Sequence, residues 1–92
     1  MQLINIGFGN IINSNKIVSM ITSDSAPAKR IVATAKENGT IIDATQGRRT
    51  RCVIICESHV VLSALMPDTI GSRIRENSTK ESYTKEESDY DA

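Results

Sequence analysis

A turn of basic residues separates two short apolar runs near the middle of this 92-residue chain. Three of the six arginines fall within Gly47–Arg51, and the flanking runs are 40–44 and 52–56. Apolar runs of about five residues bounded by turn residues are typical of buried β-strands. A charged side chain is costly to bury without a partner, so the arginines must stay outside the core that both strands enter. The pattern therefore predicts a sheet with a cationic loop at one end.

The strand expected over 52–56 is apolar almost throughout, which is typical of a central strand covered on both faces. Glu57–His59 forms a tight connection, and 60–66 follows as its antiparallel partner. We also expect shorter extended segments over 3–6, 11–12 and 16–21, separated by turns rich in glycine, asparagine and serine.

One segment has the periodicity of a main helix. Apolar residues recur at helical spacing from Ala28 to Ala35, Ser23–Ser25 offers N-cap candidates, Pro27 suits the first turn, and Gly39 ends the helix. A short second helix is expected to open at 67–68. The chain is therefore predicted to be an α+β protein with a small, mostly antiparallel sheet, one main helix and a short C-terminal helix.

Charge divides the chain into two parts. Residues 1–75 carry nine Lys and Arg against five Asp and Glu, whereas residues 76–92 carry two against six. We therefore expect one basic domain over 1–75 and an acidic, disordered tail over 76–92. The apolar runs are far shorter than the roughly 18 residues needed to span a bilayer, and no signal-peptide pattern opens the chain, so we expect a cytoplasmic protein.

Residues suited to metal or covalent chemistry are few. Cys52 and Cys56 would lie about 13 Å apart along a strand, whereas a disulfide needs Cα atoms within about 7 Å. His59 is the only histidine, so neither a zinc ligand set nor a catalytic triad is visible. Gly7–Gly9 lacks the third small residue and the following helix of a dinucleotide fingerprint. We expect no metal and no cofactor.

Asp43 precedes the basic turn and has two possible roles. Its carboxylate could be a catalytic acid or base, or it could pair with Arg48 or Arg51 and orient that side chain. We favour the ion pair, because no other catalytic group is apparent beside Asp43.

The basic residues indicate phosphate binding. Arginine forks match phosphate oxygens in a bidentate way, and a turn between two strands can hold Arg48, Arg49 and Arg51 at fixed spacing. Lys16, Lys29 and Arg30 add a second group of cations, also near the starts of elements. Phe8 is the only aromatic residue of the body, so stacking on single strands is disfavoured and binding to the backbone of a duplex is preferred.

Several motifs in one order resemble a known family. They are Leu3–Asn10 (LINIGFGN), Ser25–Pro27 followed by Lys29-Arg30, Asp43–Thr45, and Gly47–Arg51. Over residues 2–74 the chain closely resembles the RemA family, bacterial regulators of extracellular-matrix (biofilm) genes. The resemblance implies a DNA-binding transcriptional activator associated with the nucleoid. It also implies a fold similar to the LytTR-type DNA-binding domain and closed homo-oligomeric rings around which double-stranded DNA wraps.

The resemblance also implies roles for individual residues. Lys16, Arg48 and Arg49 fall on positions where the family contacts DNA, and Arg51 belongs to the same motif. Position 16 is lysine where better-known members are expected to carry arginine, so a bidentate contact becomes a point charge. We expect the working site to be the Gly47–Arg51 turn, with Lys16 beside it, repeated around an oligomer.

Three alternatives stay open on the residues themselves. The same arginines could hold the phosphates of an RNA duplex. The chain could be a small enzyme acting on a phosphorylated ligand, with Asp43 as acid or base. It could also be a scaffolding ring with no nucleic-acid partner.

Overall fold

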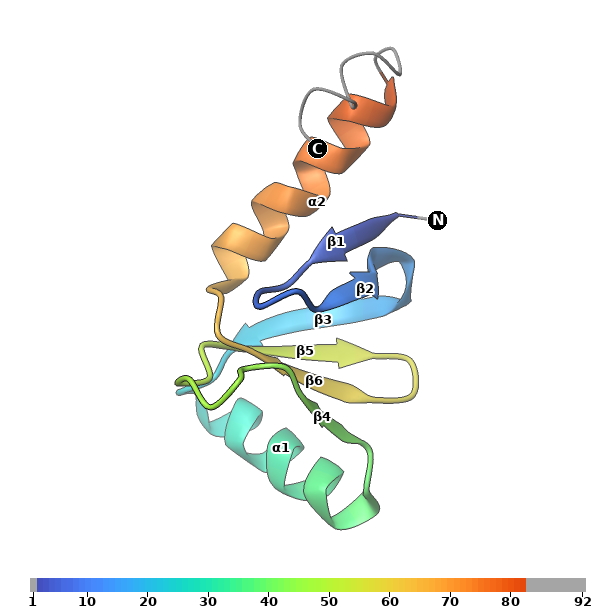
Figure 1. Ribbon diagram of the computed structural model, residues 1–92. Helices are drawn as coiled ribbons and strands as arrows, with labels where there is room; N and C mark the ends of the chain where they lie inside the picture. Colours follow the sequence, from blue (N-terminus) through green and yellow to red (C-terminus); the bar gives the residue numbers. More distant parts are fainter. Residues whose placement is uncertain (1, 83–92) are drawn as a thin grey trace.

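The computed structural model describes the backbone of residues 2–82 and the side chains of residues 2–77. The protein is a small α+β fold, as the sequence predicts, built from two sheets and two helices within this range (Figure 1). In chain order the elements are β1 (Leu3–Asn5), β2 (Ile11–Asn13), the 3₁₀ turn Ser14–Lys16, β3 (Ile17–Thr22), α1 (Ala26–Asn38), β4 (Ile41–Asp43), β5 (Cys52–Cys56), β6 (Val60–Ser63) and α2 (Pro67–Ser82).

The strands divide between two sheets, whereas the sequence indicated a single one. β1 and β2 pair only with each other, and the larger sheet has the order β3-β5-β6-β4. The tight turn 7–10 closes β1 onto β2 through a bond from the Ile6 amide to the Asn10 carbonyl (2.8 Å), and the 3₁₀ turn then separates β2 from β3. The larger sheet is mostly antiparallel, as predicted, and β4 runs parallel to β6.

Strand β5 lies inside the larger sheet and is covered on both faces, which confirms its prediction as a central strand. Cys52 and Ile54 point into the core cluster that includes Ile4 of β1 and Ile70 of α2. Val53 points the opposite way, into the cluster with Ala28 of α1 and Leu62 of β6. Figure 1 accordingly shows α1 on one side of the sheet and the β1–β2 hairpin with α2 on the other.

Helix α1 begins and ends where its capping residues predict. The Ala28 amide donates to Ser25 Oγ (3.2 Å), which satisfies one of the free amides of the first turn. Gly39 terminates the helix with a left-handed backbone (φ 70°), a conformation that glycine adopts without steric cost.

Helix α2 is longer than the short helix expected. It spans Pro67–Ser82, so the predicted boundary between a domain over 1–75 and a disordered tail from 76 falls inside a helix. Polar side chains extend its contact with β1, because Arg73 Nη1 donates to the Asn5 carbonyl (2.8 Å) and Asn77 Nδ2 to the Leu3 carbonyl (2.9 Å). The rest of the predicted tail, 83–92, lies outside the described residues. No helix within the described range is long and apolar enough to cross a membrane.

Ser63 joins the two sheets through a fully buried hydroxyl. Its Oγ donates to the Ile6 carbonyl (2.7 Å), just after β1, and accepts from the Leu65 amide (3.1 Å). A buried polar group left without a partner is strongly destabilising, so this one side chain links the hairpin to the end of β6.

Replacing Ser63 by alanine should therefore lower the free energy of unfolding by about 1–3 kcal/mol, because the Ile6 carbonyl and Leu65 amide lose a buried partner. Urea unfolding followed by circular dichroism measures the change. Ser58→Ala, which removes an exposed hydroxyl, is the matched control. Equal stability of the Ser63→Ala variant and the wild type would contradict the role assigned to this hydroxyl.

Candidate nucleic-acid interface

The loop between β4 and β5 carries the basic turn and leaves the sheet from a buried base. Ala44 and Thr45 are 4% and 2% exposed, and the Ala44 amide donates to the Leu62 carbonyl (2.9 Å). Asp43 Oδ1 accepts bonds from the Thr45 amide (2.9 Å) and Thr45 Oγ1 (2.6 Å). The loop therefore starts from a backbone whose position is set by the core.

A tight turn then directs the chain outward. The Arg48 amide donates to the Thr45 carbonyl (3.0 Å), and both central residues, Gln46 and Gly47, have positive φ (55° and 78°). This is the φ pattern of a type I′ turn, in which glycine is favoured at the second central position. Gln46 holds its left-handed conformation at a steric cost of about 1–2 kcal/mol.

The far end of the turn is also held. The Arg51 amide donates to the Ser63 carbonyl (2.9 Å), and its own carbonyl accepts from the Ser23 amide (3.4 Å). Ser23 Oγ donates to the Thr50 carbonyl (2.6 Å). The short segment that carries the three arginines is thus anchored to the sheet at both ends.

The arginines of the turn are exposed, and Arg48 lies apart from the other two. Arg49 and Arg51 line one shallow hollow of about 100 Å³ between the turn and the end of β3. Arg48 lies beside Phe8, with its Cζ atom 5.5 Å from the ring centroid. Among the described side chains, no carboxylate lies within 4.0 Å of any of these three guanidinium groups, so their charge is available to an anionic partner.

Phe8 belongs to this site although the sequence interpretation left it out. The turn 7–10 is tied to the base of the arginine loop, because Asn10 Nδ2 donates to the Ala44 carbonyl (3.1 Å) as well as to the Gly7 carbonyl (2.8 Å). Phe8 and Arg48 are far apart in the chain, so no local periodicity could reveal their proximity. The available signal was an aromatic residue between two glycines in a turn.

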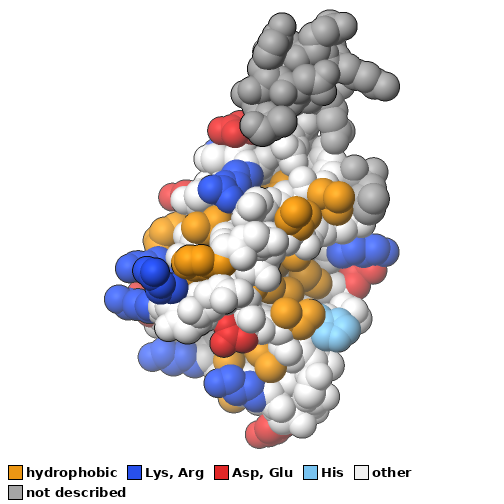
Figure 2. Space-filling view, in the orientation of Figure 1, with side chains coloured by type: hydrophobic (Ala, Val, Ile, Leu, Met, Phe, Trp, Pro, Cys, Tyr) orange, Lys and Arg blue, Asp and Glu red, His pale blue; other side chains and the backbone are white. Residues whose placement is uncertain are grey.

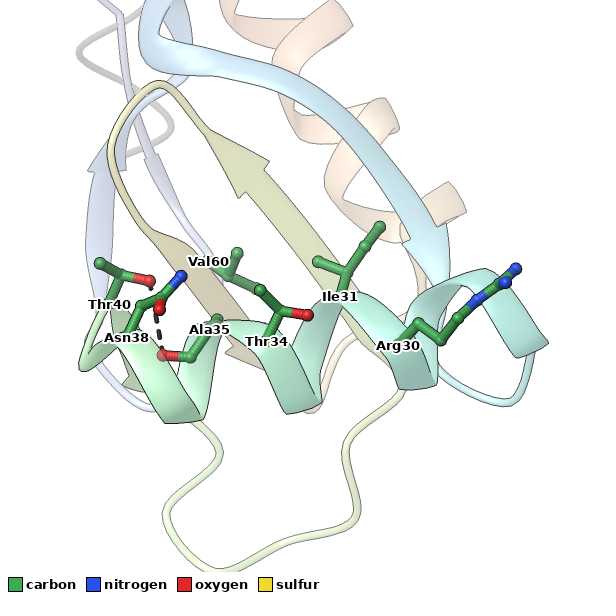
Figure 3. A pocket seen from close by; sticks show the side chains of 7 residues that line it. All are labelled: Arg30, Ile31, Thr34, Ala35, Asn38, Thr40 and Val60. Carbon is green, nitrogen blue, oxygen red and sulfur yellow. Dashed lines mark hydrogen bonds between the residues drawn. The ribbon is translucent and has the colours of Figure 1, made fainter.

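Lys29 and Arg30 leave the first part of α1 on opposite flanks. Lys29 shares a hollow of about 350 Å³ with Ser23 and Thr50, so it lies on the side of the arginine turn. Arg30 lines a different hollow of about 310 Å³ on the other flank. In Figure 3 its side chain extends along α1 away from the other lining residues, Ile31, Thr34, Ala35, Asn38, Thr40 and Val60.

Within one chain Lys16 does not lie beside the turn, so its expected place beside the turn in an oligomer stays a prediction. β3 and β5 run antiparallel, with Thr22 opposite Cys52 and Ile17 opposite Cys56, so Lys16 and Arg51 flank opposite ends of the ladder. The four-residue step from Cys52 to Cys56 alone spans roughly 13 Å. Figure 2 shows most of the visible basic side chains along the left edge of the molecule, where Figure 1 places the β4–β5 loop.

Lys16 also has a partner of its own. Its Nζ atom lies 3.4 Å from Glu57 Oε1, the only ion pair among the described side chains, and both side chains are about 60% exposed. An exposed pair of this kind stabilises a fold by at most about 1 kcal/mol. It does reduce the positive charge that Lys16 can offer to a ligand.

Asp43 does not pair with Arg48 or Arg51, so the ion pair favoured from the sequence is incorrect. Its side chain instead accepts the two bonds from Thr45, and these bonds lower the pKa of its carboxyl below the ordinary value. Hydrogen bonds to the charged form have this effect because they stabilise the carboxylate. Asp43 therefore shapes the loop through Thr45.

The two cysteines are free thiols with raised pKa values. Burial raises the pKa of Cys52 to about 11, and burial followed by the nearby Glu57 raises that of Cys56. Both thiols are therefore neutral near pH 7, which agrees with the interpretation of these residues as core side chains.

The Asp43–Thr45 contact makes stability depend on pH. A carboxyl with a lowered pKa in the folded state stabilises the fold above its unfolded pKa, about 4, and loses that contribution as pH falls through the folded value. The free energy of unfolding of the wild type should thus exceed that of Asp43→Asn most at pH 6–7, and the difference should shrink toward pH 2–3. Urea titrations of both proteins across this range measure it. A difference that is constant with pH would contradict the assignment.

The comparisons with known proteins agree with the resemblance that the sequence motifs indicated. A family model described as RemA-like, extracellular matrix regulatory protein A-like, matches residues 3–74. A proposed regulatory protein of Oceanobacillus iheyensis is 54% identical over 78 residues, which cover 84% of this chain and 91% of that protein. One of Gloeothece citriformis is 57% identical over 74 residues, covering 79% and 84%. A third, from Acetivibrio thermocellus, is 46% identical over 92 residues, covering 99% of each chain.

The matched range 3–74 contains every element from β1 through β6, both sides of the arginine loop, and the part of α2 that contacts the core. The relatives are named as regulators, which points to a regulatory protein rather than an enzyme. The chain belongs to the RemA-like family of extracellular matrix regulatory proteins.

Proposed function

We propose that the protein is an oligomeric, non-enzymatic regulator of transcription that binds the backbone of double-stranded DNA. The observation that supports this most directly is the group of three exposed arginines, Arg48, Arg49 and Arg51, on a turn anchored at both ends. None of the three forms an ion pair among the described side chains, although Asp24 lines the hollow of Arg49 and Arg51. Guanidinium groups match phosphate oxygens in bidentate geometry.

The rigidity of the turn favours binding. Its base and its end are hydrogen-bonded to the rest of the fold, so the loop backbone loses little conformational entropy when it binds a ligand. Lys29 adds a further positive charge on the side of the turn, because it lines the same hollow as Thr50. Arg30 lies on the other flank of α1. We propose that it contributes to the positive electrostatic field of the protein or to a contact between subunits.

A single copy offers few phosphate contacts, and such binding is weak at physiological salt. Repetition of the turn around a closed homo-oligomeric ring would link many weak contacts on one DNA molecule and raise the overall affinity. The same assembly gives Lys16 a role. Lys16 lies at the opposite end of the β3–β5 ladder from the turn, so DNA that follows a curved path over several copies could meet both ends.

The family suggests the biological setting. We propose that the protein activates extracellular-matrix (biofilm) genes in the cytoplasm, in association with the nucleoid. The description of the family model, extracellular matrix regulatory protein A-like, supports the link to matrix regulation. We propose also that its fold is of the LytTR DNA-binding type, with loops at the end of a sheet presented to DNA. The support for this is that the clustered arginines lie on a loop, and α1 instead packs its apolar face on the sheet.

The double variant Arg48→Ala, Arg49→Ala tests the proposal. Binding to duplex DNA should weaken uniformly across sequences, and the slope of log affinity against log salt should fall by about 1 for each phosphate that a subunit no longer neutralises. Gel retention at several salt concentrations measures both quantities. Arg75→Ala, which removes a cation from α2, is a control for a charge change elsewhere.

Solution mass completes this experiment. The wild type should form a multiple of the 10.1 kDa subunit that gains mass with duplex DNA, and the double variant should keep the assembly alone. Retention of the double variant equal to that of wild type would refute the proposed site. If an RNA duplex of the same sequence competed for the protein more strongly than the DNA duplex, the arginine turn would be assigned to RNA binding.

The Lys16–Glu57 pair allows a test in the opposite direction. Glu57→Gln removes the competing carboxylate, so affinity for duplex DNA should rise by up to about fivefold, the equivalent of about 1 kcal/mol. The double variant Lys16→Ala, Glu57→Gln should lack this gain. Glu37→Gln, which removes an exposed carboxylate from α1, controls for net charge. An equal rise with Glu37→Gln would show a general charge effect and would exclude Lys16 as a contact.

A further inference from the structure

We propose that Phe8 is a DNA-contacting residue whose ring enters a groove of the duplex beside the phosphates that Arg48 and its neighbours hold. The inference rests on the proposed DNA binding and deepens it, because it assigns a contact with the bases to a site otherwise made of contacts with the backbone. Four features of the structure support it: the exposure of the ring, the conformation of its turn, the anchoring of that turn, and its distance from Arg48.

Phe8 presents an exposed aromatic ring at the tip of a turn. The residue is 50% exposed, so much of its apolar surface faces solvent. Of the other exposed large apolar residues, Leu3, Ile11, Val18 and Ile42 lie on strands and Met66 directly precedes α2, whereas Phe8 lies at the tip of a turn. A side chain at a tip can enter a groove that a residue on a flat sheet cannot reach.

The backbone holds Phe8 in this outward position. Gly7, Phe8 and Gly9 have consecutive positive φ angles of 110°, 54° and 79°, and a bulky residue rarely adopts such a conformation. Strained conformations of this kind persist where the surroundings determine them, and they are concentrated at binding sites. A Cβ atom at Gly7 would lie 3.3 Å from the Leu65 side chain and would have to be held at φ 110°, so both packing and backbone conformation favour glycine there.

Hydrogen bonds anchor the turn on both sides. The Gly7 amide donates to Asn5 Oδ1 (2.7 Å), and the Asn10 amide donates to the Gly7 carbonyl (3.0 Å). Asn10 Nδ2 reaches across to the Ala44 carbonyl at the base of the arginine loop (3.1 Å). The Phe8 turn and the arginine loop are therefore joined into one hydrogen-bonded unit.

The proximity of Arg48 gives this unit its chemistry. With its Cζ atom 5.5 Å from the ring centroid, the guanidinium lies within cation–π range of Phe8. When Arg48 binds a phosphate, the ring is held next to the sugars and base edges that adjoin that phosphate. Apolar wedges such as Phe are inserted between base steps by proteins that bend DNA, and flexible pyrimidine–purine steps yield to them most easily. Phe8 would thus favour sites that bend readily.

The absence of tryptophan from the chain provides a direct probe. A Phe8→Trp variant has a single indole at the turn, and its emission should fall saturably as duplex DNA is added, because the indole stacks on bases. A Leu3→Trp variant is the matched control, since Leu3 is 53% exposed on β1. Its emission should stay constant over the same titration while its affinity stays that of wild type. Unchanged emission of the Phe8→Trp variant under conditions where it binds DNA would overturn the proposal.

Two further variants separate contact with DNA from positioning of Arg48. Phe8→Ala should lower affinity by roughly 5- to 150-fold, the range measured when an aromatic side chain that stacks on a base is removed, and Phe8→Leu should retain part of the binding as an apolar wedge. Equally weak binding by both, with unchanged indole emission, would mean that the ring only orients Arg48. If wild type itself fails to bind a duplex, the proposed function fails first and this inference with it. Circular dichroism of every variant verifies the fold.

Discussion

Strand β5 is buried on both faces, and this burial decides where the charged residues on either side of it can lie. Its side chains alternate between the cluster formed with β1 and α2 and the cluster formed with α1. Arg51 precedes this strand and Glu57 follows it, so the cationic turn and the Lys16–Glu57 pair are kept at opposite ends of the sheet. The separation follows from the cost of burying an unpaired charge.

The candidate interface is shaped mainly by hydrogen bonds to the backbone and to hydroxyl groups. Asp43 holds Thr45, Ser23 holds Thr50, and Asn10 holds Ala44, while the arginines themselves make no ion pairs among the described side chains. The turn is therefore both anchored and positively charged, and these two properties together favour the binding of an anionic polymer. Ion pairs within the site would have stabilised the arginines in place but would have reduced the charge available to an anionic partner.

Local patterns predicted a large part of the fold. The apolar run 52–56, the helical stripe from Ala28 to Ala35, and the capping residues Ser25 and Gly39 act over a few neighbouring residues, and each element appears where its pattern indicates. The division into two sheets and the length of α2 were not predicted. They depend on bonds between distant residues, such as that from Arg73 to the Asn5 carbonyl, and these have no periodic signal. The pairing of Asp43 with the arginines was misjudged for a related reason, because a nearer donor to its carboxylate was available in Thr45.

By itself, the sequence determined the class of fold, the central strand, the main helix and the position of the cationic turn, because apolar patterns and capping residues are read over a few neighbouring positions. Its motifs also identified the family. Only the tertiary structure decided which cations share a surface. It separated Lys16 from the arginine turn, sent Lys29 and Arg30 to opposite flanks of α1, and brought Phe8 to Arg48. Such proximity arises from strand order and register, which are set by packing between segments far apart in the chain.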